Sequence, residues 1–378
     1  MSKSLDEFAN AKLATLEQQS LLRRLSETER LSAVDVLRDG KRLISFSCND
    51  YLNLTQHPDI KAAAIAATEQ YGTGSGASRL VTGNHPLYGK LERKLADLKR
   101  TEDACVFGSG YLANTGIIPA LIGVNDMVAV DELSHACIYA GSRLSAGVVH
   151  VFRHNDLDHL REILDTNRGK HRHAMIVTDR VFSMDGDLAP VEDLSRIADE
   201  FDAWLMTDDA HGIGVVGGGD QGAVPLQMGT LSKAIGGYGG YLCASRPVID
   251  LIRTRCRTLI YSTGLPPGVV AAAIAAIDLI RSDPEYAALP LQKARAFTEA
   301  LGLAQAESPI VPIIMGSTDR TLEASRLLQD EGFLVIAIRP PTVPEETARL
   351  RVTFSAAHED ADIARLVDII KTKILAPS

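Results

Sequence analysis

The stretch WLMTDDAH, residues 204–211, joins a short apolar run to two carboxylates and a histidine. The apolar part has the length and composition of a buried β-strand, and Asp208 and Asp209 follow at its end. His211 comes two residues later. Because aspartate is also common in solvated turns, this stretch alone is compatible with a surface turn or with a charged site at the edge of a sheet.

Short apolar runs of the same kind recur along the middle of the chain. Helix-like stretches separate CVF, MVAV, VVHVF, AMIVTD, WLMTDD and YLCA. Alternation of strands and helices predicts an α/β fold with a mostly parallel sheet. Such sheets bind their ligands at the carboxyl ends of the strands, so we expect TDDAH to lie at the ligand-binding edge.

The sequence pattern divides the chain into three segments. Leucines at positions 5, 13, 16, 22 and 25, with a capping box starting at Ser4, predict an amphipathic helix within an N-terminal helical segment, residues 1–42. A large α/β domain is expected over residues 43–283, where Pro58 and Gly72 bracket one predicted helix. The runs IVPIIM, FLVIAI and LRVTF then predict a smaller C-terminal α/β domain over residues 284–378.

Composition narrows the class of protein. The 378 residues carry a formal net charge of −9, which disfavours a nucleic-acid partner. The N-terminus is polar and the most apolar window, residues 268–280, is short and contains Asp278, so we expect neither secretion nor a membrane span. Five scattered cysteines fit a reduced, cytoplasmic protein. The histidines lack the spacing of metal ligands, and no metal is expected.

A second informative stretch is MGTLSKAIGGYGG, residues 228–240, which holds one lysine among five glycines. It is not a nucleotide P-loop, because Lys233 follows Ser232 and precedes Ala234. Two interpretations remain for it alone. It is a flexible surface turn, or the glycines leave space for a bulky group attached to the lysine.

A dinucleotide-binding protein is the rival from another class. GIGVVG, residues 212–217, matches the glycine fingerprint and follows a predicted strand. However, the following GGDQGAVP cannot open a helix, and no acidic residue stands about 20 residues further on. A borohydride-sensitive yellow colour of the purified protein would exclude this class.

The pieces together suit pyridoxal phosphate. GSGYLANTG, residues 108–116, follows a predicted strand and offers helix N–H groups to a phosphate. A carboxylate at a strand end suits the pyridine nitrogen, and a lysine suits the aldehyde, with which it forms a Schiff base. The glycines around Lys233 are expected to leave room for the ring and the substrate.

Many stretches resemble the α-oxoamine synthases, pyridoxal-phosphate enzymes of fold type I, over essentially the full chain. They are NDYLNL, GSGASRLVTGNHPLYGKLE, GSGYLANTG, DELSHAC, VFSMDGDLAP, TDDAHGIGV, GTLSKAIGG, LIYSTGLPP and IRPPTVPEETARLRVTFSAAH. The resemblance implies a large sheet domain with a smaller C-terminal domain. It also implies that Lys233 holds the cofactor covalently, that Asp208 pairs with the pyridine nitrogen and that His135 stacks on the ring. Spacing alone does not choose Asp208 over Asp209.

The resemblance assigns further positions. Other cofactor-binding residues are Gly110, Tyr111, Ser183, His211, Thr230 and Thr263. Thr263 reaches the phosphate of a neighbouring subunit in this family, which implies a homodimer with shared active sites. Substrate-binding positions are Arg23, on the predicted N-terminal helix, and Asn49, Thr342 and Arg351. Arg351 is the expected clamp for an amino-acid carboxylate, because its planar guanidinium donates two parallel hydrogen bonds.

Residues 338–358 favour the branch of the family that joins L-alanine to a pimeloyl thioester, carried by coenzyme A or by a carrier protein. The alternatives are 2-amino-3-oxobutyrate CoA ligase, 5-aminolevulinate synthase and serine palmitoyltransferase. Two departures from the family pattern stand out. Residues 217–229 form a shorter segment than usual and contain Pro225, which cannot donate within a central strand. Arg180 stands where the family usually has glycine.

Overall fold

The computed structural model describes residues 3–19, 21–23, 25–216 and 224–375. The chain forms two compact units, one of Met1–Ser47 with Pro312–Val352 and one of Cys48–Val311 with Thr353–Ser378. This division differs from the boundaries expected at residues 42/43 and 283/284. The smaller unit combines two segments that are far apart in the sequence, because β12 (Phe333–Leu334) pairs in parallel with β3 (Lys41–Ser45).

The larger unit is built on a seven-stranded sheet. In spatial order its strands are β4 (Asp103–Phe107), β10 (Gly240–Ala244), β9 (Leu226–Thr230), β8 (Trp204–Asp208), β7 (Ala174–Asp179), β5 (Met127–Asp131) and β6 (Val148–Phe152). Only β10 runs antiparallel to its neighbours. The prediction of an α/β fold with a mostly parallel sheet is confirmed, and all six apolar runs lie on strands.

The segment before Lys233 folds as a central strand after all. β9 lies between β8 and β10 and begins one residue after Pro225. The proline therefore stands just outside the ladder, and its missing N–H costs the sheet no hydrogen bond. Residues 217–223, the rest of the shortened segment, lie outside the described residues.

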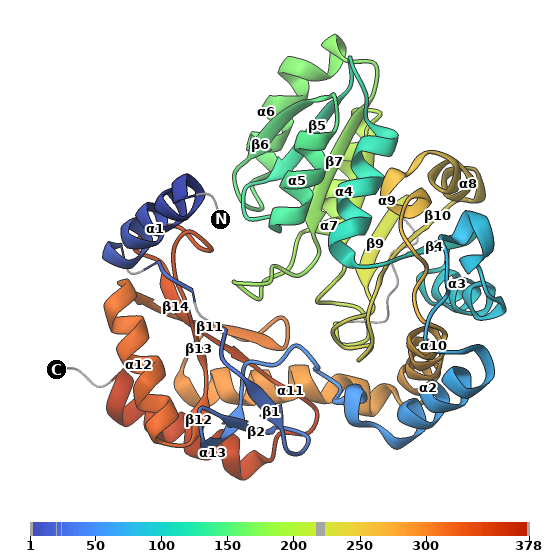
Figure 1. The fold of residues 1–378 in the computed structure, drawn as a ribbon. Helices are drawn as coiled ribbons and strands as arrows, with labels where there is room; N and C mark the ends of the chain where they lie inside the picture. Colours follow the sequence, from blue (N-terminus) through green and yellow to red (C-terminus); the bar gives the residue numbers. More distant parts are fainter. Residues whose placement is uncertain (1–2, 20, 24, 217–223, 376–378) are drawn as a thin grey trace. The chain divides into compact units, whose positions relative to one another are not determined.

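Helices cover both faces of this sheet. Along β5, Val128 and Val130 belong to the apolar cluster under α4 (Gly110–Leu121), while Met127 and Ala129 belong to the cluster under α6 (Leu157–Asn167). This alternation follows from the two-residue period of a strand. Figure 1 shows α4 and α5 (Ala136–Leu144) side by side against the sheet. The other helices of the unit are α2 (Pro58–Tyr71), α3 (Pro86–Lys99), α7 (Val191–Glu200), α8 (Arg246–Arg255), α9 (Arg257–Ile260), α10 (Pro267–Ser282), α11 (Pro284–Leu301) and α13 (Asp360–Ile369).

Local signals set the ends of α2 as predicted. Pro58 is its first residue, where the missing N–H needs no partner. Gly72 follows its last residue with φ of 85°, a conformation that L side chains rarely adopt.

The smaller unit contains two sheets. One has the order β1 (Thr28–Arg30), β2 (Asp35–Arg38), β3 and β12; the other has β11 (Ile310–Gly316), β14 (Ala348–Thr353) and β13 (Ile336–Ile338), with a few end residues assigned to the larger unit. α12 (Thr318–Asp330) and α1 (Lys3–Gln18) complete it. α1 begins before Ser4 and ends before Leu22, so the predicted cap and the predicted length are wrong. Strands β1 and β2 occupy part of the segment expected to be helical.

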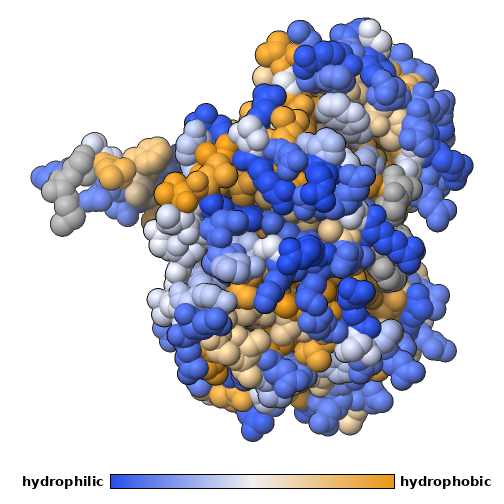
Figure 2. All heavy atoms as spheres, turned by 90° about the vertical axis from the view of Figure 1, so that its right-hand side faces the viewer, coloured by the Kyte–Doolittle hydropathy of each residue, from blue (hydrophilic) through white to orange (hydrophobic). Residues whose placement is uncertain are grey.

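The surface in Figure 2 is mostly hydrophilic, with smaller groups of apolar residues between the polar ones. In the described part of the chain, no helix combines the length and the apolar character that crossing a bilayer requires. All five cysteines are free thiols.

Candidate active site

Asp208 is the last residue of β8 and is buried at the carboxyl edge of the sheet. Asn114 of α4 donates from Nδ2 to Asp208 Oδ2 at 2.7 Å. The backbone N–H of Ala210 donates to Asp208 Oδ1 at 2.9 Å. Both donors are neutral, so they orient the carboxylate without neutralising its charge. The arrangement suits a carboxylate that must hold a positive group of a ligand.

Asp209, the next residue, has a different environment. Lys99 Nζ donates to Asp209 Oδ2, and both side chains are fully buried. Arg180 Nη1 lies 3.3 Å from Asp209 Oδ1. Two cations therefore neutralise Asp209, whereas the donors that reach Asp208, the Asn114 side chain and the Ala210 N–H, are neutral. Arg180, which stands where a glycine is usual in the resembled family, therefore serves in this chain as a counter-ion of Asp209.

Replacing Lys99 by methionine should lower the free energy of unfolding by about 1.5–3 kcal/mol, since a hydrogen bond between charged groups is lost while Arg180 still pairs with Asp209. Urea denaturation measures the loss. Lys94→Met is the matched control, because Lys94 lies on the same helix as Lys99 and pairs with Asp278 at the protein surface. Its loss should stay within about 1 kcal/mol. Equal losses in the two variants would contradict the prediction.

His135 directly precedes α5 and lies close enough to Asp208 to be influenced by its charge. Its backbone N–H donates to Asp179 Oδ2 at 2.8 Å, and its Nδ1 lies 2.8 Å from Cys137 Sγ. Burial lowers the pKa of His135, with Asp208 opposing this shift and Lys233 adding to it. Burial, together with Asp208, raises the pKa of Asp179 well above its usual value. Asp208, His135 and Lys233 therefore share one electrostatic environment, in which a neutral imidazole is suited to lie against a ring.

The start of α4 and the end of β9 form a cradle for an anion. Ser109 caps the helix by accepting the N–H of Leu112 at 3.1 Å. A Cβ at Gly110 would lie 3.5 Å from the Thr230 side chain, so the helix start and Thr230 are neighbours. Tyr111 is exposed beside them. Backbone N–H groups at a helix start are donors that suit a phosphate. The Thr230 hydroxyl donates to Gly239 O at 2.8 Å in this structure, so it would have to turn to donate to a phosphate.

Lys233 lies three residues beyond Thr230, in the turn between β9 and β10. Its carbonyl accepts the N–H of Gly236 at 2.8 Å, and Leu231 N–H donates to Gly239 O at 3.0 Å. These bonds close the turn and bring the lysine beside the anion cradle. The donors, the carboxylate and the lysine together fit pyridoxal phosphate.

The expected role of the glycines needs correction. Gly236 has φ of 70°, and a Cβ there would lie 2.7 Å from the backbone nitrogen of Thr55. A Cβ at Gly240 would lie 2.5 Å from the carbonyl oxygen of Ser109. These two glycines make room for neighbouring backbone of the protein itself, and the space they leave is already filled.

The remaining cofactor positions also lie in the larger unit. His211 Nδ1 and the Tyr51 hydroxyl are 2.7 Å apart and buried. Ser183 lies in the turn that follows β7. Thr263 is exposed and forms an isolated bridge with Ser78. The roles that the resemblance implies for these residues stay predictions.

The substrate positions are divided between the units. Asn49 Oδ1 accepts the Tyr51 hydroxyl at 3.3 Å in the larger unit. In the smaller unit, Arg23 Nη2 donates to Thr342 Oγ1 at 3.3 Å, and Arg351 is buried on β14. The prediction that Arg23 lies on the N-terminal helix is wrong, because α1 ends at Gln18.

Sequence reasoning missed three polar partners of the site. Asn114 lies one helical turn after Gly110 and faces the same way, which is a usable signal. Asp179 ends a buried strand, as Asp208 does, so the rule that selected TDDAH also applies to it. Tyr51 stands in NDYLNL, but only the tertiary contact shows that it meets His211.

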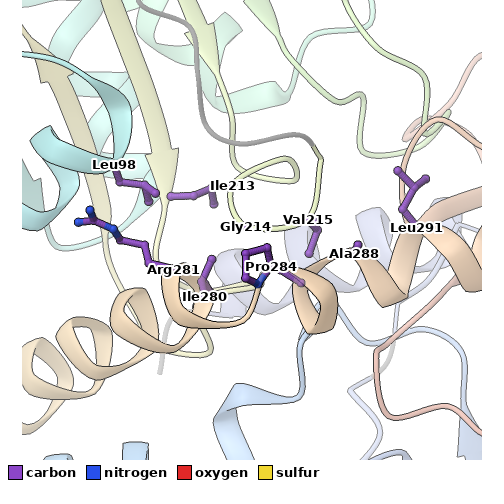
Figure 3. Close-up of a pocket in the computed structure, with 10 residues that line it drawn as sticks. Leu98, Ile213, Gly214, Val215, Ile280, Arg281, Pro284, Ala288 and Leu291 are labelled. Carbon is purple, nitrogen blue, oxygen red and sulfur yellow. The ribbon is translucent and has the colours of Figure 1, made fainter.

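An apolar cavity of about 360 Å³ lies elsewhere in the larger unit. Figure 3 shows Leu98 and Ile213 above Ile280 and Pro284, with Leu291 at the right-hand end of the view. No predicted site residue lines it. Within the described residues, no group of three or more His, Cys, Asp or Glu side chains is placed to hold a metal ion.

Comparisons with known proteins agree with this geometry. The family model described as aminotransferase class I and II matches residues 41–370. The 8-amino-7-oxononanoate synthase of Methylocella silvestris is 62% identical, over 89% of this chain and 98% of the relative. That of Beijerinckia indica is 58% identical, over 97% of each. The serine palmitoyltransferase of S. paucimobilis, solved with a bound PLP–myriocin adduct, is 28% identical with a TM-score of 0.88, covering 97% of this chain and 96% of that one.

Proposed function

The chain belongs to the aminotransferase class I and II family, and from this premise we propose that it joins L-alanine to a pimeloyl thioester, with loss of carbon dioxide, to form 8-amino-7-oxononanoate. It is a pyridoxal-phosphate enzyme of fold type I. The observation that carries the proposal is the buried Asp208 carboxylate, which the neutral side chain of Asn114 orients in the electrostatic environment of His135 and Lys233.

Pyridoxal phosphate, when bound, supplies an electron sink that stabilises a carbanion at the Cα of the amino acid. The chain's own groups make that chemistry usable. Asp208 would hold a proton on the pyridine nitrogen, and His135 would lie against the ring. The amine of Lys233 would hold the aldehyde and would serve as the base that removes the Cα proton of the amino acid. The start of α4, with Thr230, would hold the phosphate.

The identity of the substrates is tested by a panel of amino acids and acyl thioesters. L-alanine with a pimeloyl thioester should give the highest kcat/KM. A preference for glycine with acetyl- or succinyl-CoA, or for serine with palmitoyl-CoA, would move the chain to another branch of the α-oxoamine synthases. Comparing the coenzyme A and carrier-protein forms of the pimeloyl donor decides which carrier is used.

We expect Arg23→Ala to raise KM for the pimeloyl donor by about tenfold to a hundredfold, because a charge-assisted hydrogen bond to the far carboxylate is lost. Steady-state kinetics measure this change, and covalent binding of L-alanine to the cofactor should be unaffected. Arg38→Ala, another arginine of the smaller unit, serves as the control. An unchanged KM in Arg23→Ala would remove Arg23 from the substrate site.

The proposal includes a homodimer in which Thr263 completes the partner's phosphate site. Exposed apolar side chains support it, since Leu80, Val81 and Tyr261 lie in the two segments that the Ser78–Thr263 bridge joins. Neighbouring exposed apolar side chains of this kind are typical of interaction surfaces. The free thiols of all five cysteines support the cytoplasm as the site of action.

Val81→Glu should weaken the dimer by about tenfold or more, because a charge would be buried at the interface. Sedimentation equilibrium measures the dissociation constant. Val124→Glu is the matched control, since the two valines are 74% and 67% exposed. If both variants dimerise as tightly as the parent protein, the interface lies elsewhere.

A further inference from the structure

One histidine outside the predicted site makes two contacts with carboxylates. His154 follows β6, with its Nδ1 3.1 Å from Asp131 Oδ1 and its Nε2 2.7 Å from Asp187 Oδ2. Its ring also meets the edge of Phe182, with centroids 4.3 Å apart. A carboxylate can only accept, so each ring nitrogen must donate a proton. His154 is therefore an imidazolium bound between two anions.

The first anion controls the turn that leads to His135. Asp131, the last residue of β5, is fully buried. Its Oδ1 accepts the N–H of Leu133 at 2.9 Å, and its carbonyl accepts the N–H of Ser134 at 3.0 Å. His135 follows directly. The Asp131 carboxylate thus fixes the backbone that leads to His135, the residue proposed to lie against the cofactor ring.

The second anion controls the turn that carries Ser183. Phe182 N–H donates to the carbonyl of Asp187 at 3.1 Å, and Gly186 N–H donates to the carbonyl of Phe182 at 2.8 Å. Asn155 Nδ2 adds a hydrogen bond to Asp187 Oδ2 at 3.2 Å. The Asp187 carboxylate is therefore the point at which His154 holds this turn.

We propose that His154 is a positioning residue of the cofactor site, a cation that ties the His135 turn to the Ser183 turn through Asp131 and Asp187. The inference rests on the proposed function, since it assumes that these two turns hold pyridoxal phosphate. His154 touches neither cofactor nor substrate. It acts by keeping both turns in the binding geometry before the cofactor arrives.

The charges around the ring support a permanent imidazolium. Burial opposes the charge, but the hydrogen bonds that His154 donates to Asp131 and Asp187 prevail and raise its pKa to about 10. The Glu132 carboxylate, which accepts the backbone N–H of His154, is the third acid beside it. Since the folded pKa lies above the ordinary value of 6.5, the stabilisation is complete below about pH 6.5 and is lost only as the pH rises through about 10.

The test measures binding of pyridoxal phosphate to the apoprotein, followed by absorbance. His154→Gln should weaken the affinity by about tenfold to a hundredfold, because charged hydrogen bonds that pre-organise the site are lost. Hydrogen exchange of residues 182–188 in the apoprotein should become faster. His173→Gln is the matched control, since His173 stacks on Trp204 just before β7, at the amino end of the same sheet, and should leave both quantities unchanged.

A second variant keeps the test decisive if His154→Gln does not fold. Asp187→Ala removes the tie to the Ser183 turn but leaves buried Asp131 paired with His154. It should weaken the binding of pyridoxal phosphate by about tenfold and speed hydrogen exchange in residues 182–188 alone. Parental affinity and exchange in Asp187→Ala would overturn the inference. Failure of the parent protein itself to bind pyridoxal phosphate would instead overturn the proposed function.

Discussion

Lys233→Ala should leave a folded protein that no longer attaches pyridoxal phosphate covalently and turns over at least about 10²–10⁴-fold more slowly. The lysine has two tasks in the proposed reaction. Its amine holds the aldehyde, and it then moves the Cα proton, for which a positioned base alone contributes a factor of this size. The turn from Leu231 to Gly239 is closed by backbone hydrogen bonds, so we expect the variant to keep its fold.

Borohydride reduction followed by peptide mapping provides the direct measurement. In the parent protein the pyridoxyl group should be found on the peptide that contains Lys233, and in the variant it should be absent. Lys99→Met is the control, because Lys99 is the buried lysine paired with Asp209 and should not affect labelling. A pyridoxyl group on any other lysine would refute the assignment of Lys233.

Asp208→Asn should reduce kcat by about 10²–10³, a loss of about 2.7–4 kcal/mol of transition-state stabilisation. A neutral amide cannot hold the pyridine proton as a carboxylate does, so the cofactor becomes a poorer electron sink. The hydrogen bonds from Asn114 and Ala210 N–H give the carboxylate a fixed orientation, and an amide oxygen can accept only some of them. Protein that is fully loaded with cofactor should be compared, so that binding and chemistry are separated.

Asp209→Asn is the matched control at the adjacent position. It removes the acid that neutralises Lys99 and Arg180, so its main effect should be a lower free energy of unfolding. Its kcat, measured on folded protein, should fall far less than that of Asp208→Asn. The reverse pattern would show that Asp209 pairs with the pyridine nitrogen.

Much of the fold was predictable because its signals are local. The six apolar runs lie on strands since burial on both sheet faces demands nearly continuous apolar sequence. Pro58 begins α2 and Gly72 follows its last residue, as predicted, because each of these residues constrains its own backbone. The opening helix was predicted too long, since leucines at 22 and 25 have helical spacing but lie beyond Gln18 in a segment that leads into strands.

The candidate site was predictable as a set of residue types, while its contacts were not. Lys233 among glycines and carboxylates at a strand end indicated a bound cofactor. Asn114 and Asp208 are 94 residues apart, and Tyr51 and His211 are 160 apart. No local pattern indicates that such residues meet. Gly236 and Gly240 show the same limit of local sequence patterns, because the backbone that lies against them comes from distant segments.

The sequence by itself determined the α/β class, the strand that ends at Asp208 and the lysine in its glycine turn, since periodicity and backbone constraints act over a few residues. Only the tertiary structure distinguishes the surroundings of Asp208 from those of Asp209. The partners of the two adjacent carboxylates come from far along the chain. Lys99, 110 residues away, neutralises Asp209, while the side chain that donates to Asp208 is that of the neutral Asn114.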